Sequence, residues 1–216
     1  MADLLREQTL LATLLYATSH GRQGDEMAER LLRRFGSLTH VFAASRSALM
    51  KSGLSESHAV LLMTVHSIAR RCALEQLGPA PNLRDADTLN AYVRALYIGV
   101  CNERFVVLSL DGRGRFIDAR TVAEGTMREI LLQPRTLLDS VMRSGAASVI
   151  FAHNHPGGRA EFSSSDIQST RLFAAMLRST GIPLLDHMLC AGGEVVSMRR
   201  AHSLPEIFSE PASSTR

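Results

Sequence analysis

The stretch SVIFAHNHPGGRAEFSSSD, at residues 148–166, constrains the fold of this 216-residue chain more than any other. Its first part, SVIFAHNH, is β-branched, aromatic and apolar, which predicts a buried strand. The Pro-Gly-Gly that follows turns the chain, and a helical pattern begins near Ser163. A buried strand, a tight turn and a helix are therefore expected in direct succession, with the end of the strand close to the start of the helix.

Two histidines and one aspartate in this stretch have the chemistry of a metal site. Side chains of a strand alternate between its faces, so His153 and His155 are expected to point the same way. Asp166 falls where the helix begins, so its carboxylate can approach both imidazoles. Two His and one carboxylate with an open fourth position form a catalytic zinc arrangement, which activates water. Ser163-x-x-Asp166 is also the pattern of a capping box, which would only start the helix.

The spacing of these residues resembles the signature of the JAMM (MPN+) metallopeptidases. That signature is His-x-His, seven residues, Ser, two residues and Asp, and it is met by His153, His155, Ser163 and Asp166. The sequence HNHP before a glycine turn is similar to the bacterial RadC branch of that superfamily. The segments FVVLSLD, EGT, QPR and LLDHMLC also lie where RadC proteins have similar segments, so the resemblance covers roughly residues 4–208.

The resemblance implies a function and a role for each residue of the motif. One Zn²⁺ per chain would be held by His153, His155 and Asp166, and Ser163 would stabilise an oxyanion. Glu103 would act as the general base that takes a proton from the zinc-bound water. The implied activity is that of a zinc-dependent metallopeptidase or isopeptidase-like hydrolase acting on a peptide or protein substrate.

The choice of Glu103 as the general base rests on its position. JAMM enzymes carry this glutamate upstream of the histidine pair, where a strand begins with a Glu-aromatic-apolar pattern, and the sequence ERFV at Glu103 is the best match. The alternative is that Glu103 is only a surface residue at a strand end. Three other glutamates are weaker candidates for the general base: Glu124, which lies in an expected loop, Glu129 and Glu161.

The rest of the chain predicts an α/β (α+β) fold in which a mixed β-sheet is flanked by helices. FVVLSL, DGRG and RFIDARTVA form a predicted hairpin, and a helix beginning at Pro134 leads into the histidine strand. The helix after the turn is expected to bury Leu172, Ala175 and Met176, and two strands close the sheet. With the resemblance, we expect a helical domain at 1–78, a linker at 79–88, a JAMM/MPN (cytidine-deaminase-like) domain at 89–208 and a disordered tail at 209–216.

The N-terminal region, residues 1–78, has the helical periodicity of several amphipathic helices. It resembles the helix-hairpin-helix-like region of RadC proteins, which implies DNA contact through the phosphate backbone. The turn of that motif has two glycines, whereas this chain has Gly53-Leu54-Ser55. A DNA-binding role for residues 1–78 is therefore the alternative prediction, beside a purely structural one.

The composition of the chain bears on its cellular compartment and on its contact with nucleic acid or membranes. The chain is 45% apolar and 21% charged with a net charge of +3, which is ordinary for a globular protein and does not by itself argue for nucleic acid. Its three cysteines are far apart and form no CxxC, which favours a reduced, cytoplasmic protein. The first residues lack the pattern of a signal peptide, and no apolar run is long enough for a membrane span, so no membrane contact is expected.

The chain departs from the usual RadC loop at three positions. Gly157, Arg159 and Phe162 replace residues that are typically Ser, Asp and Pro, which bears on loop shape and substrate access more than on metal binding. Asp186-His187 matches a RadC Asp-His pair, and His187 is expected to be structural or to support a metal ligand from outside.

Three interpretations of the function stay open. The protein is a zinc peptidase, a DNA-associated repair or recombination accessory, or a scaffold without turnover. The intact metal ligands disfavour the scaffold.

Overall fold

The computed structural model describes residues 2–16, 23–125, 134–202, 204 and 206–208. The chain divides into two compact units, Met1–Cys72 and Ala73–Arg216. The division falls within a long helix, whereas the predicted linker at 79–88 follows that helix. The predicted tail, residues 209–216, lies outside the described residues. None of the described helices combines the length and apolarity needed to cross a bilayer.

The N-terminal unit is helical, as the periodicity predicted. Its apolar core includes Leu11, Leu31 and Leu62, which are fully buried. Ser37 and Ser45 begin two of the short helices by accepting hydrogen bonds from backbone amides three residues later. The helices are α1 (Ala2–Tyr16), α2 (Gln23–Phe35), α3 (Leu38–Ala43), α4 (Arg46–Met50) and α5 (Glu56–Glu75), the last of which continues into the second unit.

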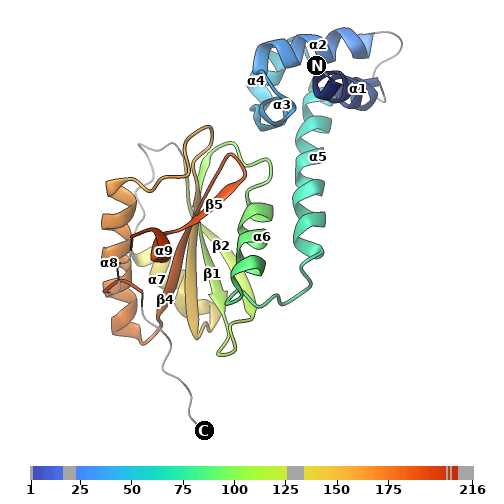
Figure 1. Ribbon diagram of the computed structural model, residues 1–216. Coiled ribbons are helices and arrows are strands. Elements are labelled where there is room, and N and C mark those ends of the chain that lie inside the picture. The colour runs from blue at the N-terminus through green and yellow to red at the C-terminus, as the bar shows by residue number, and fades with distance from the viewer. Residues whose placement is uncertain (1, 17–22, 126–133, 203, 205, 209–216) are drawn as a thin grey trace. The chain divides into compact units, whose positions relative to one another are not determined.

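The C-terminal unit is built on a five-stranded mixed sheet of order β2-β1-β3-β4-β5, in which only the β3–β4 pair is parallel (Figure 1). The predicted mixed sheet flanked by helices is therefore confirmed. Its strands are β1 (Glu103–Leu110), β2 (Phe116–Gly125), β3 (Ser148–Asn154), β4 (Leu184–Ala191) and β5 (Glu194–Ser197). Its helices are α6 (Ala86–Leu96), α7 (Pro134–Ser144), α8 (Ser164–Thr180) and α9 (Met198–His202).

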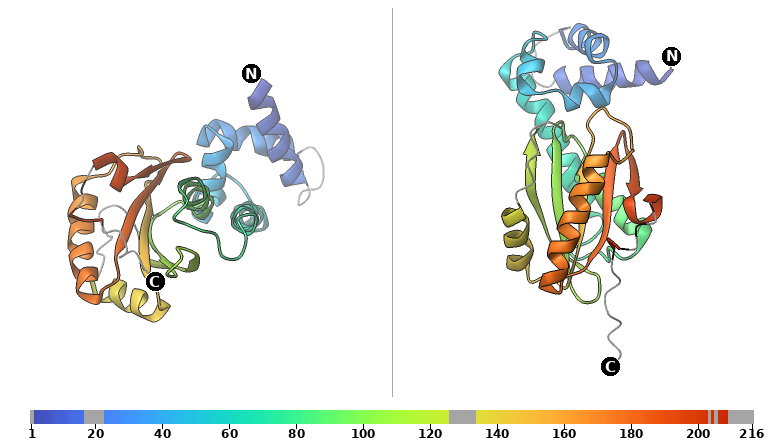
Figure 2. Two further views of the ribbon diagram at one scale, coloured as in Figure 1. Left: turned by 60° about the horizontal axis from the view of Figure 1, so that its bottom comes forward. Right: turned by 90° about the vertical axis from the view of Figure 1, so that its left-hand side faces the viewer.

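Strand β3 is central, and each of its residues is buried. Val149 and Phe151 pack with α7 and α8 on one face, whereas Ile150 and Ala152 pack with α6 on the other. The left view of Figure 2 shows α8 and α6 on opposite sides of the sheet. Because helices pack on both faces of β3, consecutive residues of the strand are apolar instead of alternating with polar ones. The alternation places His153 on the same face as Phe151, under α8.

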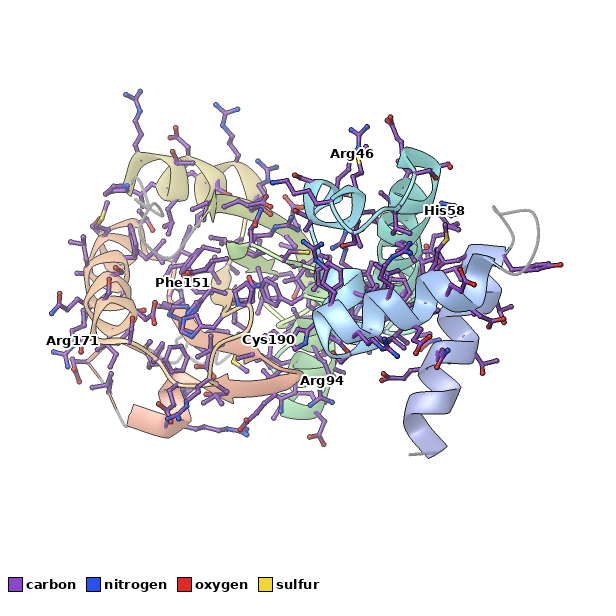
Figure 3. The ribbon with its side chains drawn as sticks, turned by 90° about the horizontal axis from the view of Figure 1, so that it is seen from above. Arg46, His58, Arg94, Phe151, Arg171 and Cys190 are labelled. Atoms are coloured by element: carbon purple, nitrogen blue, oxygen red, sulfur yellow. The ribbon has the colours of Figure 1, made fainter. Side chains whose placement is uncertain are left out.

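Phe151 is the largest fully buried side chain of the chain's described part, and it lies inside the C-terminal unit (Figure 3). Its ring contacts Phe105, Phe173 and His187, with ring centroids 5.2, 6.3 and 5.8 Å away, respectively. These aromatic contacts join β1, β3, β4 and α8 directly beneath the histidine pair. The support beneath the site is therefore apolar and closely packed.

The predicted buried face of α8 is wrong for Leu172 and Ala175, whereas Met176 is partly buried and packs against the core. Leu172 is 56% exposed, and Ala175 is exposed as well. Apolar residues occur on all sides of this part of the helix, so periodicity alone did not identify the face that packs on the sheet. The buried residues are Thr170, Phe173, Ala174 and Leu177.

Candidate metal centre

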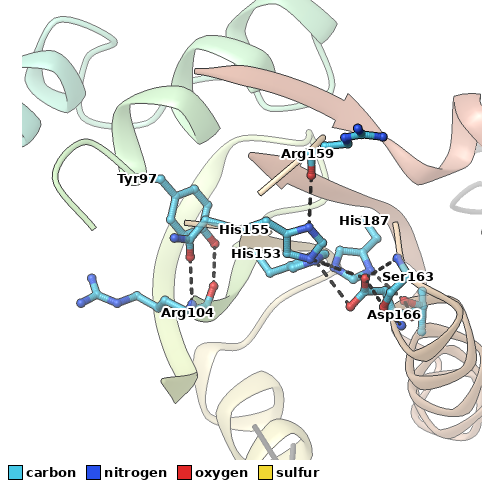
Figure 4. A network of polar contacts seen from close by, with 10 residues as sticks. Tyr97, Arg104, His153, His155, Arg159, Ser163, Asp166 and His187 are labelled. Atoms are coloured by element: carbon cyan, nitrogen blue, oxygen red, sulfur yellow. Dashed lines mark hydrogen bonds and ion pairs between the residues drawn. The ribbon is translucent and has the colours of Figure 1, made fainter. Parts of the chain in front are cut away.

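Four predicted site residues meet where β1 begins, β3 ends and α8 begins. Glu103, His153, His155 and Asp166 each offer one ligand atom, and these atoms lie within 4.8 Å of one another. Figure 4 shows the imidazoles of His153 and His155 directed at the carboxylate of Asp166. His153 and His155 do face the same way, as the alternation of the strand predicted.

The spacing of the three predicted ligands suits a tetrahedral ion. The Nε2 atoms of His153 and His155 are 3.1 Å apart. Asp166 Oδ1 lies 3.5 Å from His153 Nε2, and Asp166 Oδ2 lies 3.7 Å from His155 Nε2. A tetrahedral zinc with bonds of about 2.0–2.1 Å separates its ligand atoms by about 3.3 Å. The distances from the two histidines, each to a different oxygen of Asp166, are close to this separation, so the three side chains are suited to a zinc ion.

Glu103 has a free acceptor at this centre. Its Oε2 is buried and has no hydrogen-bond partner among the described residues. Burial raises the pKa of Glu103 above its ordinary value, although the nearby charges of His153 and His155 oppose the change. A buried carboxylate oxygen without a partner requires an explanation, and a water molecule on a metal ion would supply the missing donor. The residue thus has the position and the acceptor atom that a general base requires.

Strand pairing brings Glu103 to the site. Strands β1 and β3 are antiparallel, and Phe105 pairs with His153, so the start of β1 lies beside the end of β3. The side chain of Asn154 strengthens this contact, since its Oδ1 accepts from the Arg104 amide at 2.8 Å and its Nδ2 donates to the Asn102 carbonyl at 3.0 Å. Asn154 therefore holds the backbone on both sides of Glu103.

Asn154 is a residue of the centre that the sequence reasoning missed. In the motif His-x-His it is the variable position, for which the pattern predicts no role. Its place in a buried strand could have indicated its role. The alternation that directs both histidines to one face of the sheet directs Asn154 to the other face. A buried amide on that face needs hydrogen-bond partners. The side chain is 4% exposed.

Ser163 and Asp166 form the predicted capping box at the start of α8. The Asp166 amide donates to Ser163 Oγ at 3.2 Å, and both the amide and the hydroxyl of Ser163 donate to Asp166 Oδ2 at 2.7 Å. Burial alone would raise the pKa of Asp166, but the nearby His153 imidazole and the two hydrogen bonds from Ser163 lower it overall. The carboxylate thus stays ionised, as a ligand must. The role of Ser163 as an oxyanion donor stays a prediction.

The substitution Ser163→Ala is expected to weaken zinc binding by about 10- to 100-fold, because the hydrogen bond that orients a ligand is lost. It should also lower the free energy of unfolding by about 1 kcal/mol, the usual cost of an N-cap. Competitive zinc titration and urea unfolding measure the two effects. Ser45→Ala is a matched control, since Ser45 caps α4 in the same way but lies in the N-terminal unit. Equal zinc affinities of the two variants would contradict an orienting role for Ser163.

The atypical loop residues are compatible with the centre. Gly157 has φ +69°, a conformation that glycine adopts without strain. Arg159 contributes its backbone carbonyl, which lies 3.3 Å from Nδ1 of His155, so this contact does not depend on the Arg159 side chain. The ring of Phe162 lies 5.8 Å from that of His153 and 5.4 Å from that of His187. The three replacements therefore leave the ligand geometry in place.

His187 does not belong to the ligand cluster but contacts it. Its Nε2 lies 2.8 Å from His153 Nδ1, and the residue is 1% exposed. Burial lowers the pKa of His187 well below its ordinary value, and the charge of His153 lowers it further. The imidazole is therefore neutral and supports His153 from outside the ligand set, as expected from the sequence.

The weaker glutamate candidates do not reach the centre. Glu124 lies in β2 rather than in the predicted loop, and it forms an ion pair with Arg104 at 2.9 Å. Glu161 is exposed, and neither residue belongs to the cluster. Glu129 lies outside the described residues.

Comparison with known proteins identifies the family. Residues 83–204 match the RadC-like JAB domain. A UPF0758 protein of Cupriavidus pinatubonensis is 36% identical over 197 residues, which is 91% of this chain and 86% of that protein. A UPF0758 protein of Chromobacterium violaceum is 37% identical over 198 residues, 91% of this chain and 88% of the relative. One from Vibrio atlanticus is 31% identical over 196 residues, 90% of this chain and 88% of the relative. The domain match and these similarities, which cover most of each chain, agree, and the chain belongs to the RadC family with its MPN/JAB-type fold.

Proposed function

We propose that the C-terminal unit is a zinc-dependent hydrolase that cleaves an amide bond in a peptide or protein. The observation that carries this proposal is the convergence of Glu103, His153, His155 and Asp166 within 4.8 Å. Two imidazoles and one carboxylate are the usual protein ligands of a hydrolytic zinc ion, and they leave it a net positive charge. Bound zinc would act as a Lewis acid and make a water molecule a nucleophile near neutral pH.

The residues of the chain divide the remaining work of hydrolysis. Glu103 accepts a proton from the attacking water at Oε2 and passes it to the amine that leaves, so the new C–O bond replaces the C–N bond with protons in balance. Ser163 orients Asp166 through its hydroxyl. Turning that one proton from Asp166 to the oxygen of the attacked carbonyl would make Ser163 the oxyanion donor. The buried ring of Phe105 and the half-buried ring of Phe162 lie beside His153 and limit the access of water behind the ligands.

The proposal is tested with the full-length protein and a mixture of linear peptides and lysine-linked isopeptides. Protein loaded with zinc and the same protein after chelation are incubated with the mixture, and mass spectrometry identifies newly formed amines and carboxylates. We expect products only with zinc-loaded protein. If the protein binds zinc but cleaves neither class of amide, the hydrolase proposal is rejected and a scaffold without turnover replaces it.

A second proposal is that the N-terminal unit contacts DNA phosphates. The turn after α4 gathers cations, since Arg30 and Arg34 donate to the carbonyls of Ser52 and Lys51, each at 3.1 Å. Gly53 follows with φ +86° and lets the turn close beside the Arg30 guanidinium. Fixed cations beside a turn are suited to the phosphate backbone of a duplex.

The DNA proposal predicts that duplex DNA slows acetylation of Lys51, which is the only lysine of the chain. Peptide mass spectrometry after brief acetylation measures this one side chain. Protection should be present at about 50 mM salt and should largely disappear at about 200 mM, because phosphate contacts weaken steeply with salt. An equal acetylation rate with and without DNA at the lower salt concentration would argue against contact at this turn.

A further inference from the structure

A histidine that binds a metal through Nε2 must carry its proton on Nδ1. For His155 this condition is met directly, because its Nδ1 lies 3.3 Å from the Arg159 carbonyl oxygen, which can only accept a hydrogen bond. The proton of a neutral His155 is therefore held on Nδ1, and the lone pair of Nε2 faces the other ligands. Second partners of this kind commonly fix the orientation and protonation of metal-binding imidazoles.

The partner of His153 leaves its protonation undecided. His153 Nδ1 lies 2.8 Å from Nε2 of His187, and a ring nitrogen of neutral imidazole can be either a donor or an acceptor. If His187 donated, the proton of neutral His153 would sit on Nε2 and block the metal. The contact between the two rings is therefore useful for metal binding only when His187 accepts.

The hydroxyl of Thr170 resolves the direction of this contact. Thr170 Oγ1 lies 2.6 Å from the backbone carbonyl oxygen of Asp166 and 2.7 Å from Nδ1 of His187. The carbonyl cannot donate, so the hydroxyl proton must point to Asp166. Thr170 Oγ1 then accepts from Nδ1 of His187, which leaves Nε2 of neutral His187 as an acceptor for the proton on His153 Nδ1.

We propose that Thr170 is a positioning residue that acts through His187 to keep Nε2 of His153 unprotonated and available to a metal ion. The proposal rests on the hydrolase centre proposed above and deepens it by assigning the hydrogen-bond direction behind one ligand. Thr170, His187 and His153 are each 1% exposed. Water therefore does not reach these groups to offer the rings other partners, and the direction is set by the three side chains together with the Asp166 carbonyl.

The opposite direction is unfavourable in this geometry. It would require the Thr170 hydroxyl to donate to His187 and would leave two oxygen atoms, Thr170 Oγ1 and the Asp166 carbonyl, 2.6 Å apart without a proton between them. The rings of Phe105, Phe151 and Phe162 surround His187, and they offer its nitrogens no alternative acceptor. A single hydroxyl on α8 thus links the backbone of Asp166 to the ring of His153.

The experiment compares Thr170→Val with Thr170→Ser in the full-length protein. Valine keeps the shape of threonine but cannot accept from His187, whereas serine keeps the hydroxyl. We expect zinc affinity, measured by competition with a chelating dye, to fall by about 10- to 100-fold in Thr170→Val and to stay near wild type in Thr170→Ser. Thr180→Val is the matched control, because Thr180 also donates to a carbonyl of α8, that of Leu177 at 2.7 Å, but has no contact with the cluster.

The protonation of His187 is read separately by NMR on protein with ¹⁵N-labelled histidine, above the ordinary pKa of imidazole. Long-range ¹H–¹⁵N spectra distinguish the two neutral forms. We expect His187 to carry its proton on Nδ1 in wild-type and Thr170→Ser protein, with or without zinc. In zinc-free Thr170→Val the proton should move to Nε2, where it can donate to His153.

The outcomes separate this proposal from the hydrolase proposal. A His187 protonated on Nε2 in wild-type protein, or an unchanged zinc affinity in Thr170→Val, would overturn the role of Thr170 and leave the metal site intact. Zinc binding without any hydrolysis would reject the hydrolase but not the role of Thr170. A wild-type protein that binds no zinc would remove the metal centre, and both proposals with it.

Discussion

Replacing Glu103 by glutamine is expected to lower the rate of amide hydrolysis by about 100- to 10,000-fold while zinc stays bound, because general bases contribute about that much to catalysis. Glutamine has the size of glutamate but cannot take a proton from water. The buried Oε2 of Glu103, which has no partner among the described residues, is the atom whose chemistry is removed. Hydrolysis of the best substrate from the amide mixture and zinc content are measured on the same sample.

The control for this variant is Glu161→Gln, which neutralises an exposed glutamate outside the ligand cluster. Its turnover and zinc content should match those of the wild-type protein. Unchanged turnover of Glu103→Gln would reject Glu103 as the base. Loss of zinc from Glu103→Gln would instead indicate that the carboxylate is itself a ligand. Because Glu103→Gln retains the substrate site, it is also the form with which to capture an uncleaved natural substrate.

Removing one of the three predicted ligands is expected to abolish zinc binding at micromolar concentrations. Loss of an outer hydrogen-bond partner already costs about 10- to 100-fold in metal affinity, so loss of a ligand in His153→Ala or Asp166→Ala should cost more than about 100-fold. Asp166→Ala also removes half of the capping box. Asp166→Asn retains an oxygen for the Ser163 amide and separates loss of the negative charge from loss of the cap.

Elemental analysis after equilibrium dialysis measures this effect, starting from protein purified without chelators. We expect roughly one zinc per wild-type chain and almost none in His153→Ala or Asp166→Ala. Asp139→Ala, which changes an exposed aspartate of α7, is the control and should retain zinc. Equal and negligible zinc in wild type and ligand variants would remove the metal centre, whereas equal and full occupancy would place the ion elsewhere in the protein.

Local features of the site could be predicted because short-range geometry determines them. Side chains alternate along a strand, so His153, near the end of β3, and His155, one residue beyond that end, were expected to share a face. A helix that begins at a serine satisfies its first amides with side chains three residues apart, which brings Ser163 and Asp166 together. Both relationships lie within one stretch of chain and do not depend on the rest of the fold.

Features that depend on packing were predicted less well. The buried face of α8 was wrong because Leu172 and Phe173 are equally apolar, and only the surface of the sheet determines which of them is covered. The carboxylate candidates could be ranked only by resemblance. Pairing of β1 with β3 is what places Glu103, rather than Glu124, beside the histidines.

The sequence by itself determined the strand, the turn, the helix start and the set of candidate ligands, because each follows from backbone periodicity over a few residues. The tertiary structure alone decided which groups support those ligands. Asn154 on β3 reaches the backbone around Glu103 on β1, and Thr170 on α8 reaches His187 on β4. Hydrogen bonds between elements that are distant along the chain form only after the sheet has paired and α8 has packed on it, so no local pattern records them.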